Sequence, residues 1–216
     1  MGTSQPTPVE RLVPTPVGQG RISWYEAEST PLAVVALGHG SATGIGAADL
    51  QALARELPHV GFTVALVTYP YRVNGGWGAS EFELDTAWTA LWPEFERRGL
   101  PVVAGGRSAG SQVACRTAKS LGARAVLALA YPLRGPGSVR ELLATAVPTL
   151  IIQGGEDSYG RPAEFPRLPA FMELVEVEGG GHTFGTRAPG GRERAMDAIT
   201  SATTGWLQRL IPSERR

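Results

Sequence analysis

The chain has 216 residues, of which 43% are hydrophobic and 19% are charged, as is typical of a single soluble domain large enough for a full core. Its 20 basic and 20 acidic residues cancel, which argues against a nucleic-acid partner and against binding to a membrane surface. The longest apolar runs, at 32–37 and 125–130, are far shorter than the ~20 residues that span a bilayer.

From the N-terminal sequence MGTSQPTPVE we expect no signal peptide. It lacks the basic start and the apolar stretch of a signal peptide, and Pro6 stands where a myristoylation signal needs Ser or Thr. The single cysteine, Cys115, cannot form an internal disulfide and falls on a predicted helix, which favours a role as a small core residue. We therefore expect a cytoplasmic protein.

The first expected elements are two short extended segments within residues 10–28, on either side of a turn at Gly18–Gly20. Pro14 and Pro16 confine the first segment to the edge of a sheet, because proline has no N–H to donate. We expect residues 1–8 to be disordered and residues 9–212 to form one domain.

Beyond residue 31 the chain alternates between buried strands and amphipathic helices. Strands are predicted within 32–38, 62–70, 100–106, 123–132, 148–157 and 171–180. Helices are predicted at 46–61, 81–98, 108–121, 140–146 and from about 192 onward. This alternation predicts a three-layer α/β fold, with a mostly parallel twisted sheet, helices on both faces and an antiparallel N-terminal hairpin.

Ser108 lies between Gly106 and Gly110 in the G-x-S-x-G pattern of a nucleophile elbow. With 28 glycines in the chain, the pattern alone is weak evidence. Its context is stronger, because Ser108 directly follows a predicted strand and opens a predicted helix, whose free N–H groups then point at the site. The alternative is a solvent-facing serine that caps the helix.

A nucleophilic serine needs a base, and the chain has three histidines. His59 closes a predicted helix, where a surface cation is favourable. His39 follows the strand at 32–38 and is expected to shape the next loop. His182 lies in EGGGHTFG, just after the last predicted strand, on a loop that three glycines leave free to bend toward the centre. His182 is therefore the best candidate for the base.

Two adjacent carboxylates, Glu156 and Asp157, follow the apolar segment TLIIQGG at another strand end. Either gives the chain order serine, acid, histidine that enzymes with a nucleophile elbow show. Only one of two neighbours can face a single histidine, and both can also be solvated loop residues, so this reasoning leaves the choice open.

Acyl transfer also needs two hydrogen-bond donors where negative charge develops. The main-chain N–H of Ala109, next to the serine, is the first candidate. The second is the main-chain N–H of Ser41 in the loop GHGSATG, which His39 then shapes through hydrogen bonds without transferring a proton. A metal and a nucleotide cofactor are not expected, because the histidines and the lone cysteine form no zinc pattern and the chain has no dinucleotide or phosphate-loop motif.

Five segments carry a resemblance to a known family: LGHGSATG at 37–44, YPY at 69–71, GGRSAGS at 105–111, QGGEDSYG at 153–160 and GGGHTF at 179–184. Together they resemble the compact, lid-less, dienelactone-hydrolase-like branch of the α/β-hydrolase superfamily, which includes the KANL/Tex hydrolase-like proteins. The resemblance implies an α/β-hydrolase fold, with Ser108 as nucleophile, Asp157 as acid and His182 as base.

The chain departs from related elbows at Ser111, where a second glycine is usual. A small residue still fits there, so we expect the change to be tolerated. The resemblance implies a serine hydrolase acting on a small-molecule ester, thioester or lactone. The alternative is a hydrolase-fold interaction module or scaffold with little turnover, as some members of this branch resemble.

The interval between Tyr131 and Val147 is too short for a helical lid, so the site is expected to be open and shallow. Phe165 and Phe171, in the proline-rich run at 160–171, are candidate apolar walls of the substrate pocket, with ordinary packing as the alternative. Trp77, in the glycine-rich loop VNGGWGAS, is a further candidate at the pocket mouth.

Overall fold

A computed structural model describes residues 7–135 and 137–212. The segment 1–8, for which we expect disorder, falls mostly outside the described residues, and the domain boundary at residue 9 stays a prediction. No helix among the described residues is long and apolar enough to cross a membrane.

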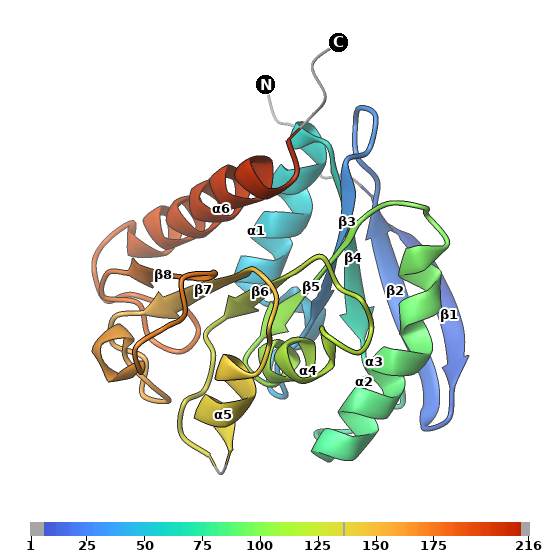
Figure 1. The fold of residues 1–216 in the computed structure, drawn as a ribbon, viewed down its shortest axis with the longest axis horizontal. Coiled ribbons are helices and arrows are strands. Elements are labelled where there is room, and N and C mark those ends of the chain that lie inside the picture. Colours follow the sequence, from blue (N-terminus) through green and yellow to red (C-terminus); the bar gives the residue numbers. More distant parts are fainter. Residues whose placement is uncertain (1–6, 136, 213–216) are drawn as a thin grey trace.

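Eight strands form one sheet in the order β1-β2-β4-β3-β5-β6-β7-β8 (Figure 1). The six strands β3 to β8 form a parallel sheet. The N-terminal hairpin of β1 and β2 extends this sheet at one edge, where β2 pairs antiparallel with β4. The strands are β1 Val9–Thr15, β2 Gly18–Tyr25, β3 Ala33–Gly38, β4 Phe62–Thr68, β5 Val102–Arg107, β6 Ala125–Leu129, β7 Thr149–Gly154 and β8 Met172–Val177. The predicted fold class is confirmed.

The N-terminal hairpin places β1 at one edge of the sheet, as the prolines predict. The expected turn at Gly18–Gly20 is wrong, because the chain reverses at Pro16 and Val17 and the glycines begin β2. Proline fixes the φ angle that the first turn position needs, and the Thr15 hydroxyl donates to the Gly18 carbonyl oxygen at 2.6 Å to close the turn.

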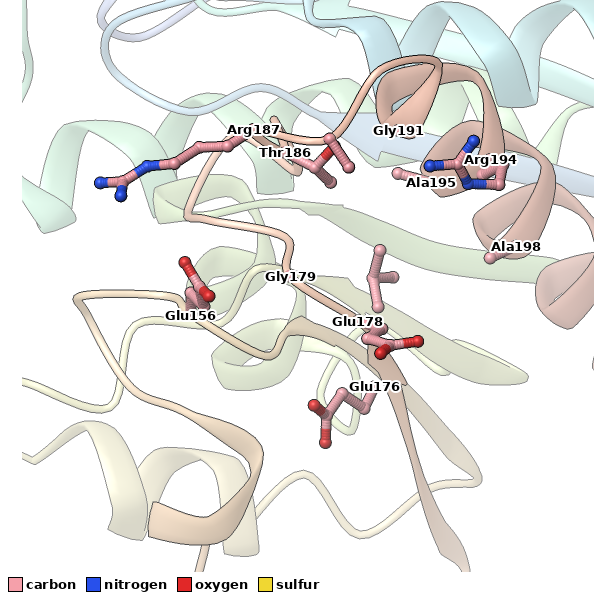
Figure 2. Close-up of a pocket in the computed structure, with 12 residues that line it drawn as sticks. Glu156, Glu176, Glu178, Gly179, Thr186, Arg187, Gly191, Arg194, Ala195 and Ala198 are labelled. Atoms are coloured by element: carbon pink, nitrogen blue, oxygen red, sulfur yellow. The ribbon is translucent and has the colours of Figure 1, made fainter.

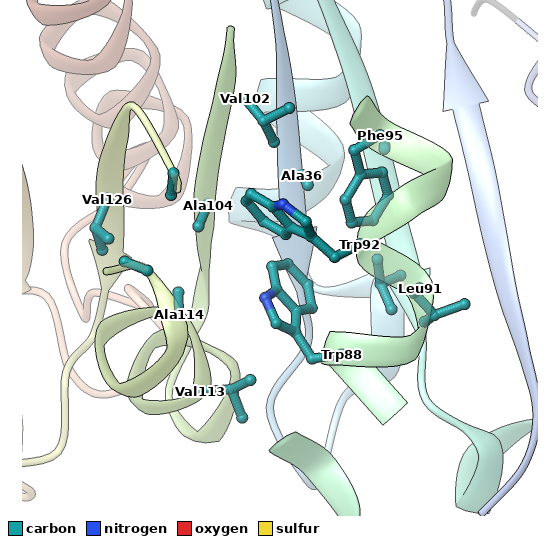
Figure 3. Packing of buried hydrophobic residues seen from close by; sticks show 14 of the residues in the cluster. Ala36, Trp88, Leu91, Trp92, Phe95, Val102, Ala104, Val113, Ala114 and Val126 are labelled. Atoms are coloured by element: carbon teal, nitrogen blue, oxygen red, sulfur yellow. The ribbon is translucent and has the colours of Figure 1, made fainter. Parts of the chain in front are cut away.

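Helices cover both faces of the sheet (Figure 1). On one face lie α3 Glu81–Glu96, α4 Ala109–Thr117 and α5 Ser138–Leu143, and on the other lie α1 Ala48–Glu56 and α6 Gly191–Leu210. Figure 3 shows Trp88, Trp92 and Phe95 of α3 packed over the small strand residues Ala36 and Ala104. Each face of the sheet therefore has its own apolar core. The candidate catalytic residues lie outside both cores, in the loops that follow the carboxyl ends of the strands.

Short helices modify the predicted pattern. The helix expected at 46–61 is shorter in the structure, because α1 ends at Glu56 and the 3-10 turn η2 Leu57–Val60 follows. Pro58 has no N–H to donate within a continuing α-helix. The single turn α2 Pro70–Val73 and the 3-10 turns η1 Gly44–Gly46 and η3 Pro162–Glu164 were not predicted. Between Tyr131 and Val147 the only described helix is α5, and it packs against α4.

Candidate active site

Ser108 lies in the sharp turn between β5 and α4, with φ 52° and ψ −119°. A non-glycine residue in this region costs roughly 1–3 kcal/mol of backbone strain, which a nucleophile elbow accepts in order to expose its side chain. A Cβ at Gly106 or Gly110 would collide with the carbonyl oxygen of Gly38 on the neighbouring strand. The flanking glycines are therefore required by the close approach of α4 to β3.

Ser111 fits at the position where a second glycine is usual. Its side chain is fully buried, and its hydroxyl donates to the main-chain carbonyl oxygen of Ser108 at 2.6 Å. The substitution therefore adds a hydrogen bond inside the first turn of α4 without crowding it.

The structure brings Ser108, His182 and Asp157 into one hydrogen-bonded chain. His182 Nε2 lies 3.0 Å from Ser108 Oγ, and His182 Nδ1 lies 2.9 Å from Asp157 Oδ2 and 3.1 Å from Oδ1. Because an ionised carboxylate only accepts, Nδ1 carries the proton and Nε2 is free to accept from the serine hydroxyl. This is the geometry that lets a histidine take the proton of a serine.

Asp157 is fully buried, and the fold supplies donors to both of its oxygens. The side-chain amide of Gln153 donates to Oδ2 at 2.9 Å, and the main-chain N–H of Tyr159 donates to Oδ1 at 2.8 Å. Gln153 also donates to the carbonyl oxygens of Tyr131 and Gly160, so it ties the end of β7 to the loop that follows. Asp157 is thereby held facing His182.

The two candidate oxyanion donors, Ser41 and Ala109, both line the cavity that contains Ser108. Neither main-chain N–H donates to another described group, so both remain available to a ligand. Ala109 begins α4, where the first N–H groups have no partner within the helix.

His39 shapes the loop that carries Ser41. Its side chain is buried, with Nδ1 donating to the Gly40 carbonyl oxygen at 2.8 Å and Nε2 accepting the Tyr69 main-chain N–H at 3.2 Å. Burial lowers the pKa of His39 to about 4, and the positive charge of Arg72 acts in the same direction, although the bond to Gly40 opposes both. His39 is therefore neutral near pH 7, in the one tautomer that both hydrogen bonds require.

A family model described as an alpha/beta hydrolase domain matches residues 31–208 of the chain. The chain belongs to this alpha/beta hydrolase family. The match spans every strand from β3 to β8 and includes all the residues of the hydrogen-bonded chain described above. The resemblance inferred from the sequence motifs is confirmed at the level of the superfamily.

Solved structures share the hydrolase fold over almost their whole length. XC6422 from Xanthomonas campestris, described as a serine hydrolase without a lid, has a TM-score of 0.79 at 18% identity, covering 97% of each chain. Est1E from Butyrivibrio proteoclasticus has a TM-score of 0.71 at 11% identity, covering 92% of this chain and 98% of its own. The dienelactone hydrolase from Anabaena variabilis has a TM-score of 0.70 at 19% identity, covering 94% and 98%. A search of curated proteins found no match.

The cavity that contains Ser108 and His182 has a volume of about 380 Å³. Most of its lining residues are small, and polar side chains alternate with apolar groups, which contribute the larger share of the exposed surface. The largest lining side chains are those of Arg107, Gln112, Arg134, Tyr159 and His182. The Tyr159 ring packs against the His182 imidazole with their centroids 4.4 Å apart. The cavity therefore offers hydrogen-bonding groups and one aromatic wall, and no deep apolar channel.

Neither Trp77 nor Phe165 lines this cavity, so a substrate contact at either residue stays a prediction. Trp77 is 83% exposed and lies over the guanidinium of Arg72, on the outer side of the loop. Phe165 packs against the apolar core under α3 and α4, and Phe171 is 41% exposed outside the cavity. Ordinary packing, the alternative for the two phenylalanines, describes Phe165, whereas Phe171 is exposed.

A second cavity of about 610 Å³ lies between the end of β8 and the start of α6 (Figure 2). Glu156, Glu176 and Glu178 line it, and neither Ser108 nor His182 does. Glu156 therefore faces away from the hydrogen-bonded chain, which decides between the two adjacent carboxylates in favour of Asp157. Among the described residues, no group of three or more His, Cys, Asp or Glu side chains is placed to hold a metal ion.

Sequence reasoning missed Gln153, Tyr159 and Arg107. Gln153 is a fully buried polar residue at the end of an apolar strand, and such a residue signals a fixed hydrogen-bonding task. The ring contact of Tyr159 with His182 and the bonds of Arg107 carried no comparable signal, because they join segments far apart in the chain.

Proposed function

We propose that this hydrolase cleaves a small carboxylic ester, thioester or lactone through an acyl-enzyme intermediate. The observation that carries the proposal is the chain from Ser108 through His182 to a fully buried Asp157, with separations of 3.0 and 2.9 Å. Gln153 and Tyr159 fix the orientation of Asp157, and Asp157 in turn fixes the His182 imidazole that faces Ser108.

In the first half-reaction Ser108 Oγ attacks the carbonyl carbon while His182 Nε2 takes the hydroxyl proton. Negative charge then develops on the carbonyl oxygen, where the N–H groups of Ser41 and Ala109 stabilise it. His182 returns the proton to the leaving alcohol or thiol, which departs and leaves the acyl group on Ser108. Water repeats these steps in the second half-reaction, with the acyl group as the electrophile and Ser108 as the leaving group.

The dimensions of the cavity support a small or polar acyl group. A volume of about 380 Å³ is at the low end for ligand pockets, and no large aliphatic side chain lines it. A longer acyl chain would extend into solvent and gain little by burial. We therefore expect kcat/KM to fall from p-nitrophenyl acetate to the octanoate ester.

A fluorophosphonate probe tests the proposal, because it reacts only with an activated serine. The expected result is labelling of the wild-type protein, loss of labelling in Ser108→Ala, and retained labelling in the control Ser120→Ala, whose serine lies in a distant turn. An unlabelled wild-type protein, or a Ser108→Ala variant that labels equally well, overturns the proposal and favours a hydrolase-fold module without turnover.

A further inference from the structure

Arg107 stands directly before Ser108, and its charged side chain is buried at the base of the active-site cavity. Only 4% of the side chain is exposed. Because arginine keeps its charge at any ordinary pH, burying it is costly unless partners fix each of its nitrogens. The proposed reaction does not require a cation here, so the contacts of Arg107 need their own explanation.

The guanidinium of Arg107 reaches three segments that lie far apart in the chain. Its Nε donates to Asp49 Oδ2 at 2.9 Å, and one terminal nitrogen donates to Thr43 Oγ1 at 3.4 Å. The other terminal nitrogen donates to the main-chain carbonyl oxygen of His182. The planar group therefore joins α1, the loop that carries Ser41, and the loop that carries the base.

Asp49 provides the anchor for these contacts. It lies in the first turn of α1, its side chain is only 3% exposed, and it forms a buried ion pair with Arg107. A guanidinium presents its donors in a rigid planar fork, so fixing Nε on Asp49 also fixes the directions of the two terminal nitrogens.

Main-chain hydrogen bonds hold the loop on either side of His182, from the Glu156 N–H to the Gly180 carbonyl oxygen and from the Phe184 N–H to the Gly181 carbonyl oxygen. Among the described residues, the only hydrogen bond to the main chain of His182 itself comes from Arg107. Gly179, Gly180 and Gly181 precede the histidine and lack side chains that could pack. Beyond it, the fully buried Phe184 anchors the loop in the apolar core under α6. The bond from Arg107 is thus made at the residue whose ring must meet Ser108, where a small main-chain shift would move Nε2 away from the hydroxyl.

We propose that Arg107, anchored by Asp49, is a positioning residue that holds the His182 main chain and the Ser41 loop in register with Ser108. The residue next to the nucleophile thereby aligns the base and the oxyanion donors through a single side chain. This inference rests on the proposed function, because alignment matters only if Ser108 and His182 exchange a proton.

Two variants separate positioning from stability. Arg107→Lys keeps the charge and the contact with Asp49 but cannot reach three acceptors at once. The double variant Asp49→Leu/Arg107→Met replaces the buried ion pair by apolar groups of similar size, a change that is often neutral for stability. The matched control is Arg116→Lys, because Arg116 also joins separate elements through its guanidinium, but its acceptors are the carboxylates of Asp85 and Glu141 on the outer helices.

For both Arg107 variants we expect kcat on p-nitrophenyl acetate to fall by about 100-fold, because a shift of about 1 Å at a reacting group has that effect. We expect KM to change by less than about threefold, since the substrate contacts remain. The melting temperature of each variant is measured alongside, and the Arg116→Lys control should keep the wild-type kcat. Folded variants that retain wild-type kcat overturn the inference.

Amide hydrogen exchange across residues 180–186 gives a readout that does not depend on activity. Loss of the Arg107 contact should accelerate exchange in this loop in both variants and leave it unchanged in Arg116→Lys. Unchanged exchange in the folded Arg107 variants contradicts the inference even if activity falls. A wild-type protein that neither turns over the ester nor labels with fluorophosphonate refutes the proposed function instead, and the exchange data still decide whether Arg107 orders the loop.

Discussion

Acidification should destabilise the protein through His39. This histidine is 1% exposed, and burial lowers its pKa from 6.5 to about 4. Between these two pH values the unfolded chain binds a proton on His39 and the folded protein does not. The stability that neutral His39 contributes is fully present above pH 6.5 and is lost as the pH falls from 6.5 toward 4. Each pKa unit corresponds to about 1.4 kcal/mol, so the total loss is about 3 kcal/mol.

The assay is urea unfolding at pH 7 and at pH 4 for the wild-type protein and for His39→Gln. Glutamine keeps an acceptor for the Tyr69 N–H and does not titrate. Because His59, His182 and all carboxylates are present in both proteins, the difference between their two pH dependences isolates His39. We expect the wild type to lose about 3 kcal/mol more than the variant between these pH values. Equal losses would refute the buried, neutral His39 and its role in the Ser41 loop.

Two further predictions test the acid and the elbow. Asp157→Asn should lower kcat by about 10⁴-fold, because the amide NH2 is a donor that can face Nδ1 and favour the wrong tautomer of the imidazole. The adjacent Glu156→Gln should retain activity, and equal effects of the two changes in steady-state ester hydrolysis would contradict the assignment. Gly110→Ala should unfold at a lower temperature than wild type, because the new methyl group collides with the Gly38 carbonyl oxygen, and an unchanged melting temperature would show that α4 approaches β3 less closely.

The strands, most helices and the three residues of the hydrogen-bonded chain were predictable from the sequence. Continuous apolar runs such as 33–38 are typical of strands buried on both faces, and parallel strands bring their carboxyl ends to one edge of the sheet. Ser108 and the Glu156–Asp157 pair follow such runs, and His182 follows the edge strand β8. Local pattern and topology together were therefore enough to place the serine, the histidine and this pair of carboxylates at one edge of the sheet.

The choice between Glu156 and Asp157 could not be made from the residues alone. The two are adjacent and chemically alike, and only the direction of the turn after β7 sends one toward His182 and the other into the second cavity. That direction depends on the Gln153 amide and on the close packing of Gly154 against the loop at 180–181, which are contacts between distant segments.

Substrate contacts were the least predictable feature. The proline-rich run between Asp157 and His182 makes Phe165 a candidate for the rim, and the glycine-rich loop does the same for Trp77, but residue type does not determine which way a loop side chain points. The exposed Trp77 ring stacks on the Arg72 guanidinium. Phe165 packs against the apolar core on the face of the sheet that α3 and α4 cover.

The central claim is that Ser108 carries an acyl group during turnover. The most direct measurement is mass spectrometry of peptides from protein quenched in acid during the first turnover of p-nitrophenyl acetate. The account predicts one acetyl group on the peptide that contains Ser108, and its absence in His182→Ala. Release of p-nitrophenol without acetylation of Ser108, or acetylation at another residue, would contradict it.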